Sequence, residues 1–247
     1  MAQPQAEKAS YLVSEHLNFF LAPAAKDTTL KLKGVFQLFI SKEKESHLQQ
    51  VQAATQSLKE SGHLSPKSLK YVEAAAVIDN FKAEKFTDGE LTLFQKFAIF
   101  DYLIGNLDRH EENWLVIFDA HADGTKTLKY IKAIDNANAF PKKHPKPFTK
   151  KVPSGLDLLI NPARNQYKWK NLNIARFTFT AEIKEFVKNN LSSEKIRSML
   201  KIIDREMPDF LDDSMHTLFL QRTDTLRRTV EEGKTPEQLA NLPMSSK

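Results

Sequence analysis

Two runs of β-branched and aromatic residues, WLVIFD (114–119) and TLKYIKAID (127–135), constrain the fold more than any other part of the sequence. The segment between them contains Asp-Gly at 123–124, a dipeptide typical of tight hairpin turns. We therefore predict an antiparallel hairpin centred on this glycine. With that centre, the residue before the first strand faces the residue that ends the second, so Asn113 and Asp135 are expected side by side.

A long helix is predicted immediately before this hairpin. Apolar residues recur at helical intervals through LTLFQKFAIFDYLI (91–104). Thr87 and Glu90 have the spacing of a capping box, in which each side chain bonds to the backbone of the other residue. The helix is expected to begin there and to lead into the loop GNLDRHEENW (105–114).

This loop adds a third oxygen ligand near the base of the hairpin. Asp108 precedes Asn113 by five positions, so Asp108, Asn113 and Asp135 would present two carboxylates and an amide oxygen. Mg²⁺ prefers such ligands and completes its coordination with phosphates and water. The order Asp, Asn, then a hairpin ending in a metal-binding Asp is typical of kinases, in which the first Asp orients or deprotonates the attacking hydroxyl. The Asp-Asn spacing alone often arises by chance, so the hairpin carries much of this hypothesis.

The rest of the chain is predicted to be mostly helical. Helical spacing extends over residues 6–17, 46–60, 180–190, 193–204 and 209–232. Ser-Pro at 65–66 is typical of a helix start, and Gly233 is typical of a helix end. The alternating segment 28–41 predicts one or two strands around Gly34.

Composition excludes several classes of function. The chain has no cysteine, and its seven histidines form no i, i+4 pair, so neither a zinc hydrolase nor a cysteine nucleophile is expected. No apolar run approaches the ~18 residues that would cross a bilayer, and the N-terminus lacks a secretory signal pattern. We therefore expect a cytoplasmic protein. A net charge of +5 favours an anionic partner.

Two segments around the predicted metal ligands, DYLIGNLDRHEENWLV (101–116) and IKAIDNANAFPKKHP (131–145), resemble the catalytic core of type II phosphatidylinositol 4-kinases. Residues 8–26 resemble the regulatory helix of that family, 34–45 its last strand and hinge, and 229–244 its closing helix and tail. The resemblance implies an α+β, protein kinase-like fold. It also implies a partial N-lobe and hinge over residues 1–41, and a mostly helical C-lobe with the catalytic loop and metal hairpin over 42–247.

The resemblance implies roles for three groups of residues. Those expected to act at the substrate hydroxyl are Asp108, Arg109 and His110. Those expected to hold Mg²⁺ or Mn²⁺ are Asn113 and Asp135. Those expected at the ATP site are Gln37, Phe39 and Ile40 at the hinge, and Glu7, which would pair with the ATP-binding lysine.

The chain departs from the family pattern in two places. His110 stands where type II enzymes usually have glycine, and histidine there is similar to the wider phosphoinositide 3-kinase group. Only six residues precede Glu7, and the sequence has no G-x-G segment. We therefore expect a truncated product that lacks the phosphate loop and binds ATP poorly by itself. A degenerate kinase with another phosphate clamp is the alternative.

A lysine-rich segment, KKHPKPFTKK (142–151), follows the metal hairpin, and YKWK (167–170) places two more lysines around a tryptophan. In a lipid kinase these residues would dock on the membrane, because lysines attract anionic lipids and tryptophan favours the interface. The residues concerned are Lys142, Lys143, Lys150, Lys151, Lys168, Trp169 and Lys170. The alternative interpretation is a solvated basic loop with a tryptophan in the core.

Three functions remain open at this point. The first is ATP-dependent phosphorylation of phosphatidylinositol by an enzyme that is peripheral on an acidic membrane. The second is a protein kinase of the same fold that binds an inositol phosphate as a regulator. The third is a catalytically inactive module that binds acidic lipids or a partner. Nucleic acid is not expected as a partner, because no recognised motif accompanies the basic residues.

Overall fold

The computed structural model describes residues 3–22, 25–27, 35–37, 72–106, 108–142 and 167–242 of the chain, with side chains from residue 5 onward and none for 25–27 and 35–37. The helices predicted over 46–60 and from residue 65 lie outside these ranges. So do residues 28–34 of the predicted strand segment. Of the predicted ATP-site residues, Phe39 and Ile40 also lie outside them.

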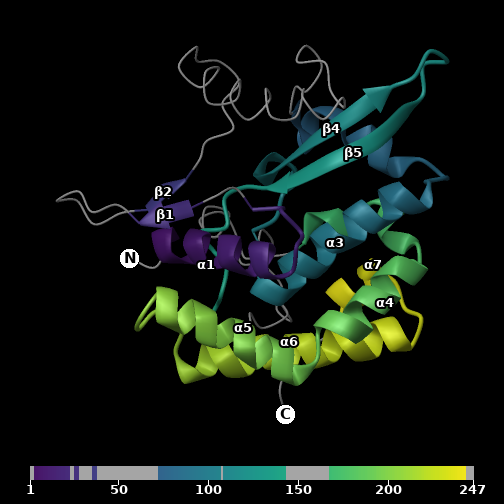
Figure 1. Ribbon diagram of the computed structural model, residues 1–247. Helices are drawn as coiled ribbons and strands as arrows, with labels where there is room; N and C mark the ends of the chain where they lie inside the picture. Colours follow the sequence, from purple (N-terminus) through teal and green to yellow (C-terminus); the bar gives the residue numbers. More distant parts are fainter. Residues whose placement is uncertain are drawn as a thin grey trace, which may run out of the picture.

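The described chain is mainly helical and carries a small antiparallel sheet (Figure 1). The α-helices are α1 (Gln3–His16), α3 (Asp88–Ile104), α4 (Ala181–Asn190), α5 (Ser193–Glu206), α6 (Asp213–Glu231) and α7 (Pro236–Ala240). The short 3₁₀ helices are η1 (Ala74–Lys82), η2 (Glu111–Asn113), η5 (Lys168–Asn171) and η6 (Asn173–Arg176). The strands are β1 (Ala25–Asp27), β2 (Val35–Gln37), β3 (Val72–Glu73), β4 (Trp114–Ala120) and β5 (Lys126–Ala133).

The central helix α3 begins at the predicted capping box. The Thr87 hydroxyl accepts from Glu90 N at 3.3 Å, and Glu90 Oε2 accepts from Thr87 N at 2.9 Å. The other carboxylate oxygen of Glu90 accepts from Leu128 N of β5 at 2.9 Å, so the cap also joins the helix to the hairpin. Most residues of α3 are buried, because the sheet and α1, α4, α6 and α7 all contact it.

The predicted hairpin is confirmed, with its register shifted by one position at the base. His121 N donates to Thr125 O across the turn, and a bulge at Lys129 adds a residue to β5. Ile134 N therefore donates to Asn113 O at 3.0 Å. The residue opposite Asn113 is Ile134, and Asp135 lies one position further along. Two features together account for the shift in register: the loop that closes the hairpin, and the bulge in β5.

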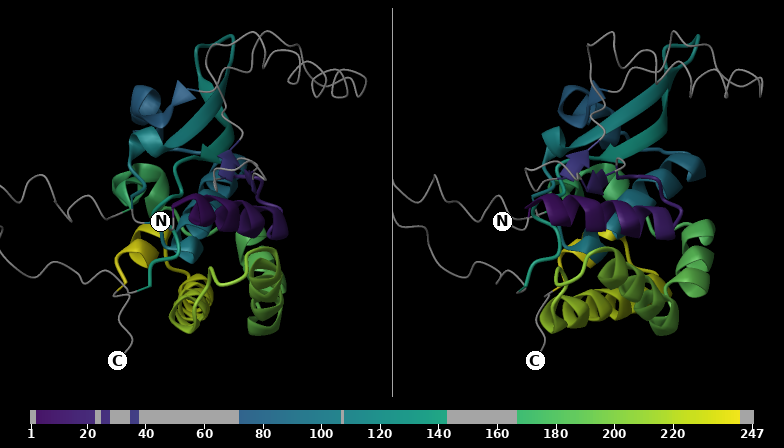
Figure 2. Two further views of the ribbon diagram at one scale, coloured as in Figure 1. Left: turned by 90° about the vertical axis from the view of Figure 1, so that its left-hand side faces the viewer. Right: turned by 60° about the vertical axis from the view of Figure 1, so that its left-hand side comes forward.

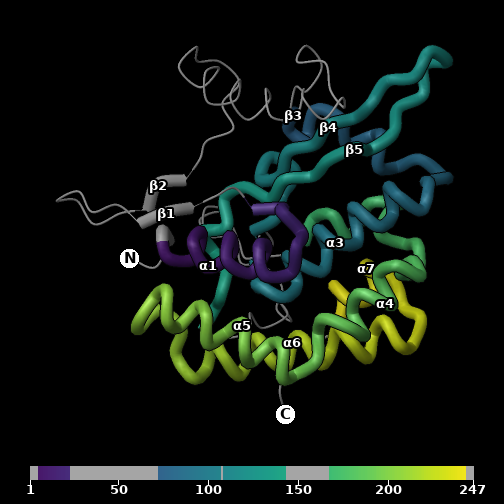
Figure 3. Tube along the Cα trace, in the orientation of Figure 1, coloured from purple at the N-terminus to yellow at the C-terminus, as the bar shows by residue number. Residues whose placement is uncertain are grey.

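Two further strands and a layered arrangement complete the fold. β3 pairs antiparallel with β4 and makes the order β3-β4-β5, as the trace in Figure 3 shows. β1 and β2 form a separate antiparallel pair. The views in Figures 1 and 2 place α1 and α3 between the three-stranded sheet and the pair of α5 and α6.

The core beneath the hairpin is aromatic. The rings of Phe97 and Trp114 stack with centroids 4.8 Å apart, and the ring of Phe81 lies 4.9 Å from that of Trp114. All three side chains are buried. This cluster packs α3 against the first residue of β4.

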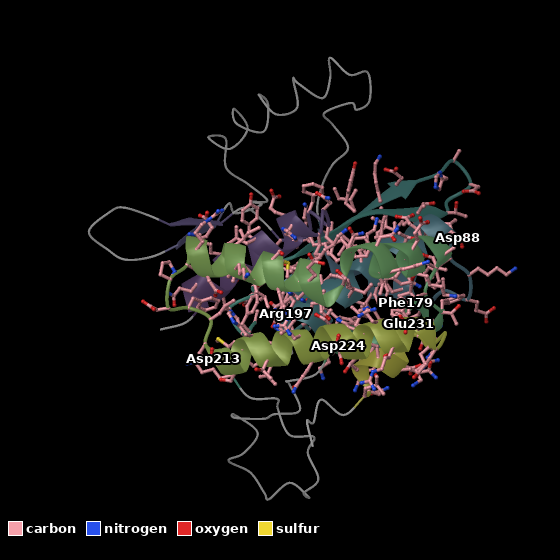
Figure 4. The ribbon with its side chains drawn as sticks, turned by 60° about the horizontal axis from the view of Figure 1, so that its bottom comes forward. Asp88, Phe179, Arg197, Asp213, Asp224 and Glu231 are labelled. Atoms are coloured by element: carbon pink, nitrogen blue, oxygen red, sulfur yellow. The ribbon has the colours of Figure 1, made fainter. Side chains whose placement is uncertain are left out.

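The predicted C-terminal helices are confirmed as α4, α5 and α6. The N-cap residues Thr180, Ser192 and Asp212 each accept a hydrogen bond from a backbone N–H of the first turn. Gly233 follows α6 with φ +70°, as expected for the residue that ends a helix. Figure 4 shows Asp213, Asp224 and Glu231 along α6. None of the described helices is both long enough and apolar enough to span a bilayer.

Candidate functional site

The loop between α3 and β4 begins at a glycine that no other residue could easily replace. Gly105 has φ +67°, and its N–H donates to Asp101 O at 2.9 Å. A Cβ there would lie 3.0 Å from Pro141 Cδ and 3.1 Å from Arg222 Cζ. Both the backbone conformation and the close packing therefore require glycine.

A buried asparagine next to this glycine joins the two loops that carry the predicted site. Asn106 Oδ1 accepts from Asp108 N at 3.2 Å, and its Nδ2 donates to Asp135 O at 3.2 Å. Asn106 was not among the predicted site residues. Its position directly after the glycine that ends α3 was the available signal, because asparagine side chains often bond to nearby backbone groups in such loops.

The three predicted oxygen ligands lie on loops that hydrogen bonds hold together. Asn113 Nδ2 donates to Asp108 O at 2.8 Å, and Asp108 Oδ2 accepts from Asn138 Nδ2 at 2.9 Å. Asp135 is exposed and has a left-handed backbone with φ +52°. A non-glycine residue with this backbone is uncommon, and such strained positions cluster at functional sites.

The ligand set fits a hard divalent cation. Because the Asn113 amide nitrogen donates to Asp108 O, its Oδ1 is left as an acceptor. The carboxylates of Asp108 and Asp135 add the anionic oxygens that Mg²⁺ or Mn²⁺ prefers. Within the described ranges, no group of three or more His, Asp or Glu side chains could hold a metal. A cation here would therefore need the Asn113 oxygen and oxygens from a bound phosphate.

Arg109 was predicted to act at the substrate hydroxyl, and the structure places it elsewhere. Its side chain is fully buried, and Nε donates to both carboxylate oxygens of Asp101, at 2.9 and 3.0 Å. Its terminal nitrogens donate to Asn113 O, Ile134 O and Asn136 Oδ1. A guanidinium occupied in this way is not available to a substrate. The contacts of the guanidinium suit it instead to hold the loop that contains Asp108 against the end of β5.

His110, the third residue predicted beside the hydroxyl, is partly exposed. Its carbonyl accepts from Asn113 N at 3.0 Å and so begins η2. Its ring Nδ1 lies 3.8 Å from Glu112 Oε2. The ring is thus placed at the surface of the loop, two positions after Asp108 in the chain, and its role stays a prediction.

Trp169 was predicted to contact a membrane, and this prediction is wrong for the described conformation. The indole is 1% exposed, and its Nε1 donates to Asp101 Oδ2 at 3.0 Å. Its ring stacks on Tyr167 with centroids 5.0 Å apart. The alternative interpretation, a tryptophan in the core, is confirmed. Burial raises the pKa of Asp101 to about 6, against the opposing effects of Arg109 and Trp169.

Glu7, on α1, reaches the loop that follows β5. Its Oε1 accepts from Asn136 N at 2.5 Å, and its Oε2 accepts from Asn136 Nδ2 at 3.1 Å. Burial raises the pKa of Glu7, while the bonds from Asn136 act in the opposite direction. The carboxylate therefore binds the residue that follows Asp135. Its predicted pairing with an ATP-binding lysine stays a prediction.

The C-terminal end of the loop that follows β5 is anchored by an aromatic residue. Phe140 has φ +57°, and its N–H donates to Ile104 O at 2.7 Å. Its ring stacks on Phe219 of α6 and meets Phe210 edge-on. The loop from Asp135 to Phe140 thus has left-handed residues at both ends and contacts to both α1 and α6.

The remaining predicted residues are only partly described. Lys142 Nζ lies 2.9 Å from Asp212 Oδ2, and Lys170 Nζ donates to Asn241 Oδ1 at 3.0 Å. Lys168 is partly exposed. Gln37 lies in β2, and its side chain is outside the described part, as are Lys143, Lys150 and Lys151.

Comparison with known proteins assigns a family. Residues 7–160 match the family model "Phosphatidylinositol 3- and 4-kinase", which is more than half of the chain and contains the whole candidate site. Phosphatidylinositol 4-kinase type 2-beta from Mus musculus is 28% identical over 201 residues, covering 70% of this chain and 39% of that protein. Phosphatidylinositol 4-kinase type 2-alpha from Danio rerio is 25% identical over 198 residues, covering 70% of this chain and 40% of that protein.

The type 2-beta protein of Danio rerio is 24% identical over 197 residues, covering 70% of this chain and 36% of that protein. The chain therefore spans well under half the length of these relatives. With a family model that matches residues 7–160, this chain belongs to the phosphatidylinositol 3- and 4-kinase family.

Proposed function

We propose that this chain carries the catalytic core of an enzyme that transfers the γ-phosphoryl group of ATP to the inositol headgroup of phosphatidylinositol. The relatives named above are phosphatidylinositol 4-kinases, which supports this choice of substrate. The observation that carries the proposal is the set of hydrogen bonds that joins the loops of Asp108, Asn113 and Asp135.

In this proposal Asp108 receives the proton of the attacking hydroxyl. The hydroxyl oxygen forms a bond to the γ-phosphorus, the bond from that phosphorus to the bridging oxygen breaks, and ADP leaves. The bond from Asn138 and the backbone bonds of the loop keep the Asp108 carboxylate in place. His110 is the nearest candidate in the chain for a second contact to the reacting groups.

Asn113 and Asp135 would hold the divalent cation, which when bound neutralises charge on the phosphates of ATP. The chain prepares this site in advance, because Arg109 and Asn106 bind the backbone around both ligands. Fixed ligands need no rearrangement when charge develops in the transition state.

The remaining roles that we propose include residues outside the described ranges. A hinge between a partial N-lobe (1–41) and a C-lobe (42–247) would contact adenine through Gln37, Phe39 and Ile40. Glu7 would pair with the lysine that binds ATP. Lys142, Lys143, Lys150 and Lys151, with Lys168 and Lys170, would face an acidic membrane. The whole enzyme would then work peripherally on that membrane.

Radiolabelled ATP tests the proposal when it is supplied with Mg²⁺ and either phosphatidylinositol vesicles or protein substrates. We expect label in the lipid, and loss of at least about a hundredfold in Asp108→Asn, a size typical for removing a general base. Asp119→Asn is the matched control, because this exposed carboxylate on β4 pairs with Lys129 away from the loops.

Label found only in the protein substrates would indicate a protein kinase and would overturn the proposal. Absence of label in both substrates would leave a binding module. The chain alone is expected to be slow. Efficient transfer by the chain alone would point to a second phosphate clamp among its own lysines.

A further inference from the structure

The two tryptophans of this chain are equally buried but differ in one hydrogen bond. Trp114 and Trp169 are each 1% exposed, and each packs against phenylalanines of α3. The Trp114 indole N–H has no partner among the described residues, whereas that of Trp169 donates to Asp101. Trp114 therefore serves packing alone, and Trp169 serves packing and a polar network.

The polar network leads from Trp169 to the candidate site through two side chains, Asp101 and Arg109. Asp101 accepts from Trp169 through Oδ2, and both of its carboxylate oxygens accept from Arg109 Nε. Arg109 then donates to the backbone carbonyls of Asn113 and Ile134. The side chains of Trp169, Asp101 and Arg109 are each at most 1% exposed.

The backbone around Asp101 strengthens the same link. Its carbonyl accepts from Gly105 N, from Asn106 N and from the hydroxyl of Tyr167. Lys168 N donates to Arg109 O at 3.2 Å. The segment that contains Trp169 is therefore bonded to the catalytic loop through both side chains and main chain.

We propose that Trp169 is a positioning residue for the reaction at Asp108, and that it acts through the buried carboxylate of Asp101. The inference rests on the proposed function. The indole supplies a hydrogen bond to a charge that has no access to water. Without that bond, Arg109 would be the remaining side-chain partner of the carboxylate, and the guanidinium would be held less firmly in the position from which it binds the metal-loop backbone.

Loss of a hydrogen-bond donor to a buried carboxylate is expected to have a large effect on that carboxylate. Hydrogen bonds to charged groups are stronger than neutral ones, and a buried acceptor that loses its partner is destabilised. Burial already raises the pKa of Asp101 to about 6, so one donor fewer favours the protonated form further. A protonated Asp101 attracts Arg109 less.

The test compares Trp169→Phe with Trp114→Phe in the full chain. Both changes remove an indole and keep a ring. For Trp169→Phe we expect kcat for phosphoryl transfer to fall about tenfold with the KM for ATP unchanged, because the effect is on the position of Asp108. For Trp114→Phe we expect kcat within about twofold of wild type, since no hydrogen bond is lost. Equal losses in the two variants, with a wild type that transfers phosphate, would overturn the inference and leave the proposed function intact.

A double-mutant cycle and an exchange measurement separate positioning from simple loss of packing. In an Asp101→Asn background, Trp169→Phe should lower kcat by less than about twofold, because its target is already changed. By nuclear magnetic resonance, the Arg109 Nε–H proton should exchange at least about tenfold faster in Trp169→Phe and no faster in Trp114→Phe. If the wild type transfers no phosphate, the proposed function fails. Faster exchange would then still support the link from Trp169 to the loop, and unchanged exchange would overturn it.

Discussion

Asp101 with Arg109, and Asp212 with Lys142, are two aspartate–cation pairs of equal length in very different surroundings. Both nitrogen–oxygen distances are 2.9 Å. Both side chains of the first pair are 0% exposed, whereas Lys142 is 68% exposed and Asp212 is 40% exposed. The first pair lies beneath the candidate site, and the second lies at the start of α6.

Burial of the aspartate outweighs the effect of the cation beside it. Desolvation raises the pKa of Asp101 to about 6 despite the cation beside it. At the surface, hydrogen bonds from Ser214, Lys142 and the backbone hold the pKa of Asp212 well below its usual range. A buried pair therefore carries a large penalty that only complete hydrogen bonding offsets, while an exposed pair changes stability little.

Arg109→Ala should have the largest effect on stability. It leaves the Asp101 carboxylate buried without its cation, and breaking a buried pair in this way typically costs about 3–5 kcal/mol. Lys142→Ala is the control and should change the free energy of unfolding by about 1 kcal/mol or less. Urea unfolding at neutral pH measures both. Similar losses would show that burial does not distinguish the pairs.

The pH dependence of stability should have opposite signs for the two aspartates. Because the folded pKa of Asp101 is about 6 and its usual value is 3.8, the folded state binds the proton more tightly. Wild-type stability relative to Asp101→Asn should therefore fall as pH rises through this window, by roughly 3 kcal/mol between about pH 4 and pH 7.

Asp212 should behave in the opposite way. Its lowered pKa stabilises the folded state above the usual value, and this contribution is lost as pH falls through the folded pKa. Unfolding of wild type and Asp101→Asn between about pH 4 and pH 7, and of wild type and Asp212→Asn below about pH 4, measures both signs. A relative stability of wild type over Asp101→Asn that rises with pH would contradict the assignment for the buried pair.

Asp135→Ala should remove Mg²⁺-dependent nucleotide binding and leave the fold intact. The side chain is exposed, so its loss leaves no buried cavity, while one of the anionic ligands of the proposed metal site disappears. We expect affinity for Mg²⁺–ATP to fall at least about tenfold by calorimetry, with the native circular dichroism spectrum retained. Equal affinity in both proteins would remove Asp135 from the metal site.

Lys142→Glu should have the smallest effect. The lysine is mostly exposed and partly neutralised by Asp212, so it contributes about 1 kcal/mol or less to attraction toward an anionic surface. Co-sedimentation with anionic vesicles should weaken a few-fold at low salt and not at high salt. Asp212→Asn should do the reverse and strengthen binding slightly. No change in either variant would show that this end of the lysine-rich segment does not face a membrane.

Local patterns in the sequence were sufficient to predict several elements. The capping box of Thr87 and Glu90, the hairpin turn near Gly124 and the end of α6 at Gly233 all depend on residues within a few positions of one another. Their hydrogen bonds close over short distances in the chain, so neighbouring residue types are enough to specify them. The kinase-like order of Asp108, Asn113 and Asp135 was likewise visible as spacing.

Tertiary structure decided which of the singled-out side chains face solvent. Trp169 lies 68 residues from its partner Asp101, and Glu7 lies 129 residues from Asn136. Flanking lysines made Trp169 resemble a membrane residue, yet the distant helix α3 supplies both the core around it and the acceptor for its N–H. In the same way, the sequence determined that an arginine follows Asp108. Only the fold decided that this arginine is buried and binds backbone, because burial depends on segments that meet in space and not on neighbours in the chain.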